Sequence, residues 1–306
     1  MSAETPNADS VTEFESHRRF LGGVAYRMLG SVTEAEDAVQ DAYLRWHDTA
    51  PDTIAKPRAF LTTVISRICL DRLKSARAQR ETYVGPWLPE PLVELQDDHS
   101  LEHELSQDAS IALMLALERL SPLERAVFLL HDVFDVEFDE VASTLSRSSA
   151  ACRQLAKRAR DNIREERSRF QVEKRDSERL SEAFFHASRS GDTETLSQLL
   201  TDSAILMTDG GGRRISARRP IYGLAKICRF FAGVARKSGG VNQPIWARRA
   251  LVNGVPGWLT LERDGLLQAT GFDIREGRIV EIYMIRNPEK LKHLDYLIDE
   301  AGALPN

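Results

Sequence analysis

The sequence predicts a multidomain protein in which two all-α domains precede an α+β domain. Apolar residues recur at helical spacing from Val11 to about Arg80, and again from Ile111 to about Phe170. A stretch with three prolines and eight acids separates these two blocks. After about Val172, two helical segments lead into short β-rich runs, an order typical of an α+β domain with one curved sheet.

Composition excludes several classes of protein. A chain of 306 residues with 42% hydrophobic and 28% charged residues has enough apolar material for two or three domains. No apolar run approaches the ~20 residues that cross a bilayer, and the acidic N-terminus is unlike a signal peptide, so we expect a cytoplasmic protein. Cys69, Cys152 and Cys228 form no CxxC pair, and His99 and His103 have no further ligand types beside them. We therefore expect free thiols, no metal and no cofactor.

The first helical domain is expected over residues 11–82, after a frayed tail that ends near residue 12. Ser31 and Thr33 are candidate N-caps for a helix with an acidic first turn. Pro57 suits the first turn of the next long helix, because that position needs no backbone N–H donor.

A linker is expected over residues 83–108, where three prolines forbid a regular helix. Trp87, Leu88, Leu92 and Val93 form an apolar cluster that a free tether would expose to water. A plain tether stays open as an alternative, but the cluster favours a linker that docks on the third domain.

The second helical domain is expected over residues 109–170. The sequence Ser121-Pro122-Leu123-Glu124 fits a capping box with proline at the first helical position. Residues 138–163 have the pattern of a helix-turn-helix, with a tight turn at 146–148; an ordinary helical hairpin is the alternative. Ser146 stands where a turn glycine is common, and we expect its φ to stay negative.

Two basic stretches stand out in a chain of net charge −5. Residues 56–80 hold seven Lys or Arg against one acid, and residues 147–169 hold eight against three. A polyanion needs cations on one face rather than a basic protein overall, so two separate footprints on one nucleic acid are indicated. A solvated helix face would also explain either stretch alone.

The third domain is expected over residues 174–300. Helices are predicted at 177–189, 192–200 and 220–236. Strands are predicted at 204–208, 245–252, 258–262, 266–274 and 279–285, with turns at Asp264-Gly265 and Glu276-Gly277.

These residues resemble a bacterial sigma factor of the extracytoplasmic-function group. SVTEAEDAVQDAYLRW (31–46) is similar to the polymerase-binding helix of that family, and KPRAFLTTVISRICLDRLKSARAQRE (56–81) to its −10-recognition helix. Residues 138–163 are similar to its −35-reading helix-turn-helix. WLPEPL (87–92), DGGG (209–212) and NPEKL (287–291) are marks of the SigJ-type subgroup, which carries a C-terminal SnoaL-like, or NTF2-like, cone domain.

The resemblance implies a sigma domain 2, a sigma domain 4 and a regulatory SnoaL-like domain, with core RNA polymerase (its clamp and flap regions) and promoter DNA as partners. It places the polymerase contact on Glu34, Asp37 and Asp41, whose acidic surface suits a basic partner. It implies phosphate-backbone contacts from Arg58, Arg67, Lys74 and Arg77, base contacts from Ser149, Arg153 and Gln154, and phosphate contacts from Lys157 and Arg158.

The third domain has weaker signals. The interdomain contact is expected from Trp87, Leu88, Leu92, Asp209, Gly210, Gly211, Gly212, Asn287 and Pro288. Asp209, Asp273, Tyr222 and Tyr283 are candidate groups for a pocket that takes a small ligand, but no nucleophile–base pair is evident. We therefore expect a non-catalytic sigma factor, monomeric when free. The alternatives are a SnoaL-like isomerase or cyclase fused to a DNA-binding module, and a ligand-responsive regulator.

Overall fold

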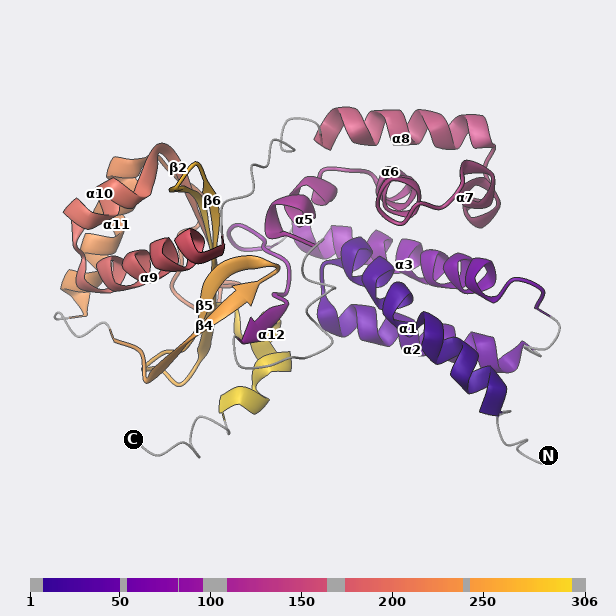
Figure 1. The fold of residues 1–306 in the computed structure, drawn as a ribbon, viewed down its shortest axis with the longest axis horizontal. Coiled ribbons are helices and arrows are strands. Elements are labelled where there is room, and N and C mark those ends of the chain that lie inside the picture. The colour runs from indigo at the N-terminus through magenta and orange to yellow at the C-terminus, as the bar shows by residue number, and fades with distance from the viewer. Residues whose placement is uncertain are drawn as a thin grey trace. The chain divides into compact units, whose positions relative to one another are not determined.

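The computed structural model describes residues 8–49, 54–81, 83–95, 109–163, 174–238 and 243–298. The chain forms two compact units (Figure 1). The helical unit comprises Met1–Glu81 and Ala112–Arg167, and the sheet unit comprises Thr82–Ile111 and Ser168–Asn306. The two helical blocks therefore share one unit, and the linker belongs with the sheet. None of the described helices is long and apolar enough to cross a membrane.

Three long helices begin the helical unit: α1 (Ala8–Leu29), α2 (Val32–Asp48) and α3 (Pro57–Glu81). The helix α1 starts at Ala8, so the predicted tail to residue 12 is too long. Ser31 caps α2 as predicted, since its side-chain oxygen accepts the Glu34 N–H. The indole of Trp46, 2% exposed, donates to the Ser10 carbonyl oxygen at 3.0 Å and fixes α2 on the start of α1.

Five shorter helices follow among the described residues of this unit: α5 (Ile111–Glu118), α6 (Pro122–Val127), the π-helix η2 (Phe128–Val133), α7 (Phe138–Leu145) and α8 (Ser149–Ile163). The capping box of α6 forms as predicted, between Ser121 and Glu124. The buried guanidinium of Arg125 pairs with Glu118 at 2.7 Å and donates to the Met28 carbonyl oxygen at 2.7 Å. This side chain therefore joins the second block to α1.

The helix-turn-helix is confirmed as α7, a turn and α8, with one correction in the turn. Ser146 adopts φ 54° and ψ 50°, a left-handed conformation, where we expected a negative φ. The reason is the helix end. A left-handed cap lets the Arg147 N–H reach back to the Ala142 carbonyl oxygen at 2.9 Å, which satisfies a group the helix leaves unpaired.

The sheet unit contains one seven-stranded mixed sheet of order β1-β4-β5-β6-β7-β2-β3. Its strands are β1 (Val93–Leu95), β2 (Leu200–Asp209), β3 (Ile221–Tyr222), β4 (Trp246–Val252), β5 (Val255–Leu261), β6 (Leu267–Arg275) and β7 (Arg278–Ile285). Only β2 and β7 pair in parallel among the described strands, and the remaining pairs are antiparallel. The predicted mixed α and β architecture is confirmed.

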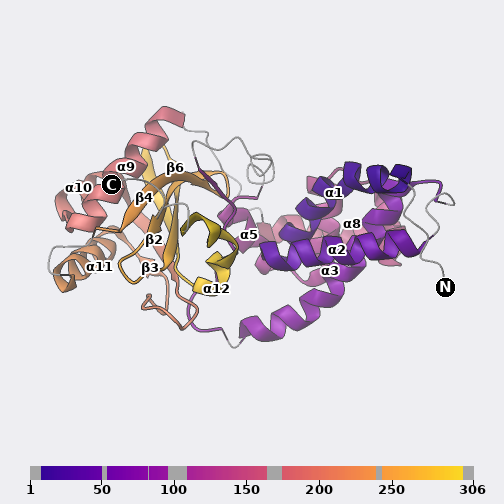
Figure 2. The same ribbon diagram turned by 90° about the horizontal axis from the view of Figure 1, so that it is seen from below.

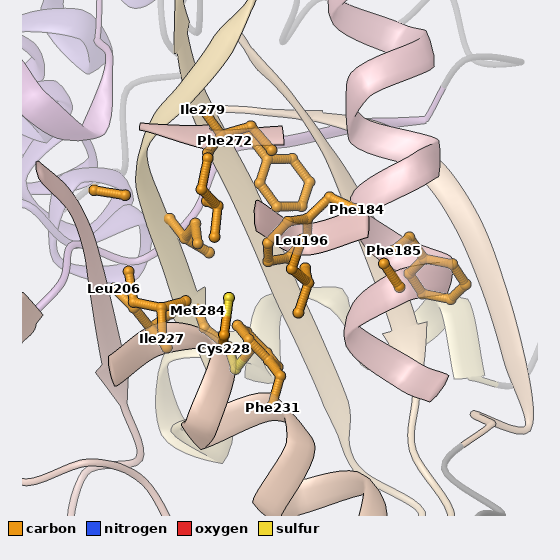
Figure 3. Packing of buried hydrophobic residues seen from close by; sticks show 14 of the residues in the cluster. Phe184, Phe185, Leu196, Leu206, Ile227, Cys228, Phe231, Phe272, Ile279 and Met284 are labelled. Atoms are coloured by element: carbon orange, nitrogen blue, oxygen red, sulfur yellow. The ribbon is translucent and has the colours of Figure 1, made fainter. Parts of the chain in front are cut away.

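Helices cover the sheet on both sides (Figures 1 and 2). The helices α9 (Lys174–Ser190), α10 (Thr193–Leu199) and α11 (Leu224–Lys237) lie on one side; the short α12 (Pro288–Leu291) and the 3-10 turn η4 (Lys292–Leu294) lie on the other. Figure 3 shows the core between α9, α11 and the sheet, where Phe184, Phe231, Phe272 and Met284 pack together. The Phe184 ring meets those of Phe231 and Phe272 edge-on, with ring centres 5.4 and 5.0 Å apart.

Three features of the sheet differ from the predicted strands. The linker contributes β1, which pairs with β4 at one sheet edge. The helix predicted from Pro220 begins only at Leu224, because Ile221–Tyr222 forms β3 first. The β4–β5 hairpin turns at Asn253-Gly254, both with positive φ, and we did not predict this turn.

Candidate nucleic-acid interface and linker clamp

The outer face of α8 is a candidate surface for nucleic acid. Cys152, Ala156, Ala159 and Ile163 are buried, and Arg153, Gln154, Lys157 and Arg158 are exposed on the opposite face. Ser149 lies at the first turn, where its hydroxyl donates to Asp139 at 2.5 Å. The Arg153 guanidinium lies 5.3 Å from the centre of the Phe138 ring, which limits the directions in which it points.

A cleft of about 640 Å³ opens in the helical unit beside α3. Its walls combine cations with apolar groups: Arg45, Lys56, Arg67, Phe60 and Val64 line it, together with Ala59, Thr63, Asp48, Thr49 and, from α7, Glu140, Ser143 and Thr144. Cationic side chains beside an aromatic ring suit a phosphate backbone with an unstacked base. The cleft thus has the chemistry expected of a single-stranded nucleic-acid site.

The predicted cations of α3 do not all reach this cleft. Arg67 lines it and is exposed. Arg58 is exposed, with its guanidinium 4.6 Å from the centre of the Phe20 ring. The side chains of Lys74 and Arg77 lie outside the described residues.

The predicted acidic residues of α2 differ in exposure and in partners. Asp41 is half-buried and accepts a hydrogen bond from Arg72 at 2.6 Å, and the same guanidinium donates to the Glu34 carbonyl oxygen. Asp37 is exposed. Leu44, two turns beyond Asp37, is 52% exposed, so this face combines carboxylates with an exposed apolar side chain.

The linker is held on the sheet unit by one buried carboxylate. Asp209 ends β2 and has no exposed area. Its Oδ1 accepts from the Tyr83 hydroxyl at 2.5 Å and from the Gly211 N–H at 3.0 Å, and its Oδ2 accepts from the Leu88 N–H at 2.9 Å. Burial raises the pKa of the Tyr83 hydroxyl, and the hydrogen bond to Asp209 raises it further, so this phenol remains a donor.

Lys290 supplies the counter-charge. Its Nζ lies 2.8 Å from Asp209 Oδ2 and also donates to the Leu88 carbonyl oxygen. The ammonium lies 4.7 Å from the centre of the Tyr83 ring and 4.3 Å from that of Trp87. We call Tyr83, Leu88, Asp209 and Lys290 the linker clamp. A buried carboxylate and ammonium are tolerated here because each has several partners.

A second attachment holds the end of the linker. The Asn253 side chain accepts from the Leu92 N–H at 3.2 Å and donates to the Ala109 carbonyl oxygen at 2.9 Å, and its backbone N–H donates to the Leu92 carbonyl oxygen. His293 Nε2 lies 3.0 Å from the Pro91 carbonyl oxygen. Leu88 and Leu92 are buried, and Trp87 is half-buried. The structure therefore places the described linker against the sheet unit.

The glycine loop after β2 permits this close approach. A Cβ on Gly211 would collide with the Asn287 side chain, and one on Gly212 would press on Val84 of the linker. At Gly210 it would meet the Arg214 carbonyl oxygen and Ser216. Both Gly211 and Gly212 also have positive φ.

Asn287 joins the loop to α12. It caps that helix by accepting the Glu289 N–H, and it donates to the Tyr83 hydroxyl at 2.9 Å. Pro288 is the first residue of α12, and Lys290 lies two residues later in the same helix. Of the predicted residues, Trp87, Leu88, Asp209, Gly211 and Asn287 lie around the clamp, whereas Leu92 lies at the second attachment.

Sequence reasoning missed Tyr83, Asn253, Lys290 and His293. Lys290 lies inside the NPEKL segment, but a lysine in a short helix usually indicates a solvated face. Asn253-Gly254 is a hairpin signal that was available in the sequence.

The four candidate pocket groups are not brought together. Asp209 binds the linker, Asp273 accepts from Arg275 at 2.8 Å, Tyr222 is exposed on β3, and the buried Tyr283 hydroxyl donates to Glu281. None of them lines the cavity of the sheet unit. In the described part of the chain, no group of three or more His, Cys, Asp or Glu is placed to hold a metal.

Comparison with known proteins agrees with this arrangement. The Sigma-70 region 2 model matches residues 14–79, and the Sigma-70, region 4 model matches residues 110–163. ECF RNA polymerase sigma factor SigJ of Mycobacterium tuberculosis H37Rv is 40% identical over 92% of both chains. The probable ECF RNA polymerase sigma factor SigI of the CDC 1551 strain is 30% identical over 92% of this chain and 94% of its own.

The crystal structure of M. tuberculosis SigJ superposes with a TM-score of 0.76 at 38% identity, covering 92% of this chain and 98% of that one. The chain belongs to the extracytoplasmic-function RNA polymerase sigma factors.

Proposed function

We propose that this sigma factor, which directs promoter-specific transcription initiation, is controlled in cis by its own sheet unit. The linker clamp carries the proposal. Residues 83–95 leave the first promoter-binding segment and approach the second, and the clamp holds them on a separate domain. A bound linker restricts how the two segments move, so the sheet unit influences their engagement with polymerase and DNA.

The partners are core RNA polymerase and promoter DNA. We assign the polymerase clamp to the α2 face with Asp37, Asp41 and Glu34, and the flap to the second helical segment. Ser149, Arg153 and Gln154 contact base edges, and Lys157 and Arg158 contact phosphate, because they occupy successive turns of an exposed helix face. Arg58, Arg67, Lys74 and Arg77 contact the −10 strand.

The free protein acts as a monomer in the cytoplasm, and its function requires no catalysis by the chain. The domains follow the assigned roles: residues 11–82 form sigma domain 2, residues 109–170 form sigma domain 4, and residues 174–300 form the regulatory domain. In a regulator that used only the helix-turn-helix, the exposed Asp37 and Leu44 on α2 would have no binding role.

Polymerase binding tests the assignment. Asp37→Lys reverses the exposed carboxylate of α2, and we expect it to weaken binding to core polymerase at least tenfold by surface plasmon resonance, because like charges then meet at the interface. Glu36→Lys is the matched control: it makes the same charge change on the same helix, about 100° around the axis. Equal loss in both variants, or in neither, removes the α2 face as the contact.

A further inference from the structure

A cavity of about 80 Å³ lies inside the sheet unit and has no role in the function described above. It lies between α9, α11 and strands β5, β6 and β7. Six of its fifteen lining residues are aromatic, and Figure 3 labels four of these: Phe184, Phe185, Phe231 and Phe272. Phe185 stacks on Trp258 at 4.3 Å between ring centres. These rings make one side of the cavity apolar.

The other side of the cavity is polar and charged. Arg189 and Glu262 form a bidentate pair, with nitrogen–oxygen distances of 2.8 and 2.5 Å, and the Thr260 hydroxyl donates to Glu262 at 2.7 Å. Both oxygens of the only carboxylate lining the cavity are thus already used. Gln268 and Thr270 complete this polar side.

Because Glu262 is paired with Arg189, Arg286 also lines the cavity but has no carboxylate partner among the lining residues. Its Nη1 donates to the Ile215 carbonyl oxygen at 2.6 Å, but its Nε is buried and has no hydrogen-bond partner among the described residues. Of its charged neighbours, Arg189 and Glu262 pair with each other, and Arg214 pairs with Asp264 at 2.5 Å. Burial lowers the pKa of Arg286, and the charge of Arg214 lowers it further. A half-buried guanidinium whose buried Nε has no acceptor favours an anion.

We propose that this cavity binds a short-chain carboxylic acid, with the carboxylate on Arg286 and the alkyl chain among the phenylalanines. The size follows from the volume, since a cavity of ~150 Å³ holds benzene and this one is smaller. Val234 and Phe230, both half-buried, line the cavity from α11. The negative charge expected of the ligand follows from the lining residues, because the cavity has two guanidinium groups, Arg189 and Arg286, and one carboxylate, Glu262.

The cavity is also connected to the linker clamp through the backbone. The Arg286 N–H donates to the Asp209 carbonyl oxygen at 2.7 Å, and the next residue, Asn287, donates to the Tyr83 hydroxyl. Arg286 is the residue between the end of β7 and Asn287, the N-cap of α12. An acid that draws the Arg286 side chain toward the cavity therefore acts next to a residue that contacts the clamp. We therefore infer that the acid changes the stability of the bound linker. This second step rests on the proposed control in cis, and the binding step does not.

Saturation-transfer NMR on the full-length protein tests binding, with butyrate as the probe and 1-butanol and butylamine as chain-matched probes of other charge. We expect butyrate to bind at least tenfold more tightly than either. Arg286→Gln is expected to weaken butyrate binding at least tenfold, whereas Arg278→Gln, which changes an exposed arginine at the start of β7, leaves butyrate binding unchanged. Val234→Phe fills the cavity without altering a charge and is expected to abolish binding, which covers the case in which Arg286→Gln fails to fold.

Equal binding of butanol and butyrate overturns the carboxylate assignment, and undiminished binding to Val234→Phe overturns the site. The link to the linker is read separately, as a change of at least threefold in amide exchange over residues 83–95 when butyrate is added. Binding without that change refutes the coupling alone. Neither measurement involves polymerase, so these outcomes are distinct from a failure of the proposed function.

Discussion

Arg153 and Lys157 lie one helical turn apart on the exposed face of α8. A bidentate contact to a base edge distinguishes sequences by ~1–3 kcal/mol, whereas a phosphate contact does not. We expect Arg153→Ala to lose discrimination among −35 sequences, and Lys157→Ala to weaken all sequences alike and lower the salt slope by about one. Fluorescence anisotropy over a salt series measures both. The same behaviour in the two variants would refute the division of roles.

Glu262 makes the stability of the sheet unit depend on pH. Burial alone would raise the pKa of this carboxyl, but the hydrogen bond and charge of Arg189, with Thr260, lower it overall. A carboxyl with a lowered pKa stabilises the fold above its ordinary value of ~4.3 and loses that contribution as pH falls through the folded value. We therefore expect the protection of amides in β5 and β6 against exchange, relative to an unfolded chain at the same pH, to fall below about pH 4.

Glu262→Gln tests the cause of that acid sensitivity. The variant is expected to be less stable at pH 7 and to have a flatter acid response, because the amide does not titrate. Glu194→Gln, an exposed site on α10, serves as the control. An unchanged acid response in Glu262→Gln would assign the effect to another group.

At the residue scale, local chemistry predicted more than long-range pairing did. Ser31 and the Ser121–Glu124 box were predictable because a cap is decided within three residues. The clamp was not, because Tyr83 and Asp209 are 126 residues apart, and Lys290 and Leu88 are 202 apart. No periodicity records such a pairing.

Among the elements, the linker depends most on its partners. Residues 83–92 form neither helix nor strand, so their backbone groups are satisfied by Asp209, Asn253 and Lys290. The segment β1 is only three residues long and follows three prolines, which explains why its pairing was not predicted from strand propensity. The docking was foreseeable from Trp87, Leu88 and Leu92, because apolar side chains require cover.

Lys290→Met removes the ammonium and leaves the Asp209 carboxylate buried without its counter-charge. Breaking such a pair costs about 3–5 kcal/mol. We expect the Leu88 amide to exchange at least tenfold faster, by mass spectrometry on full-length protein. Lys292→Met, exposed two residues later, is the control. If the exchange of residues 83–95 is equal in the two variants, the clamp does not hold the linker.

On the scale of the whole molecule, the division into units was the least predictable feature. The sequence indicates three domains, but α6 and α7 pack with α1 and α3 in a single helical unit. The Thr63 and Thr144 hydroxyl oxygens lie 3.2 Å apart, and both residues line the cleft with the cations of α2 and α3. The helix α7 therefore forms one wall of the surface that we assign to the −10 strand.

We expect this wall to move when the promoter binds. A disulfide in Thr63→Cys/Thr144→Cys should hold α7 on α3 and reduce promoter-dependent transcription at least tenfold, with activity restored by reductant. Cys69, Cys152 and Cys228 are buried, and burial raises the pKa of each thiol, so they compete poorly for oxidation. The double serine variant is the control. Full activity of the oxidised protein would show that no opening is required.

The docked linker also orders events during synthesis. Leu92 and its partner Asn253 are 161 residues apart, so the linker leaves the ribosome long before the part of the sheet unit that binds it has been synthesised. At 5–20 residues per second this delay is roughly 8 to 32 s. The nascent chain therefore presents both promoter-binding segments before the sheet unit is complete, and the unprotected Trp87, Leu88 and Leu92 form a temporary target for chaperones. A ribosome that pauses late in the message would prolong the time during which the linker is not bound to the sheet unit.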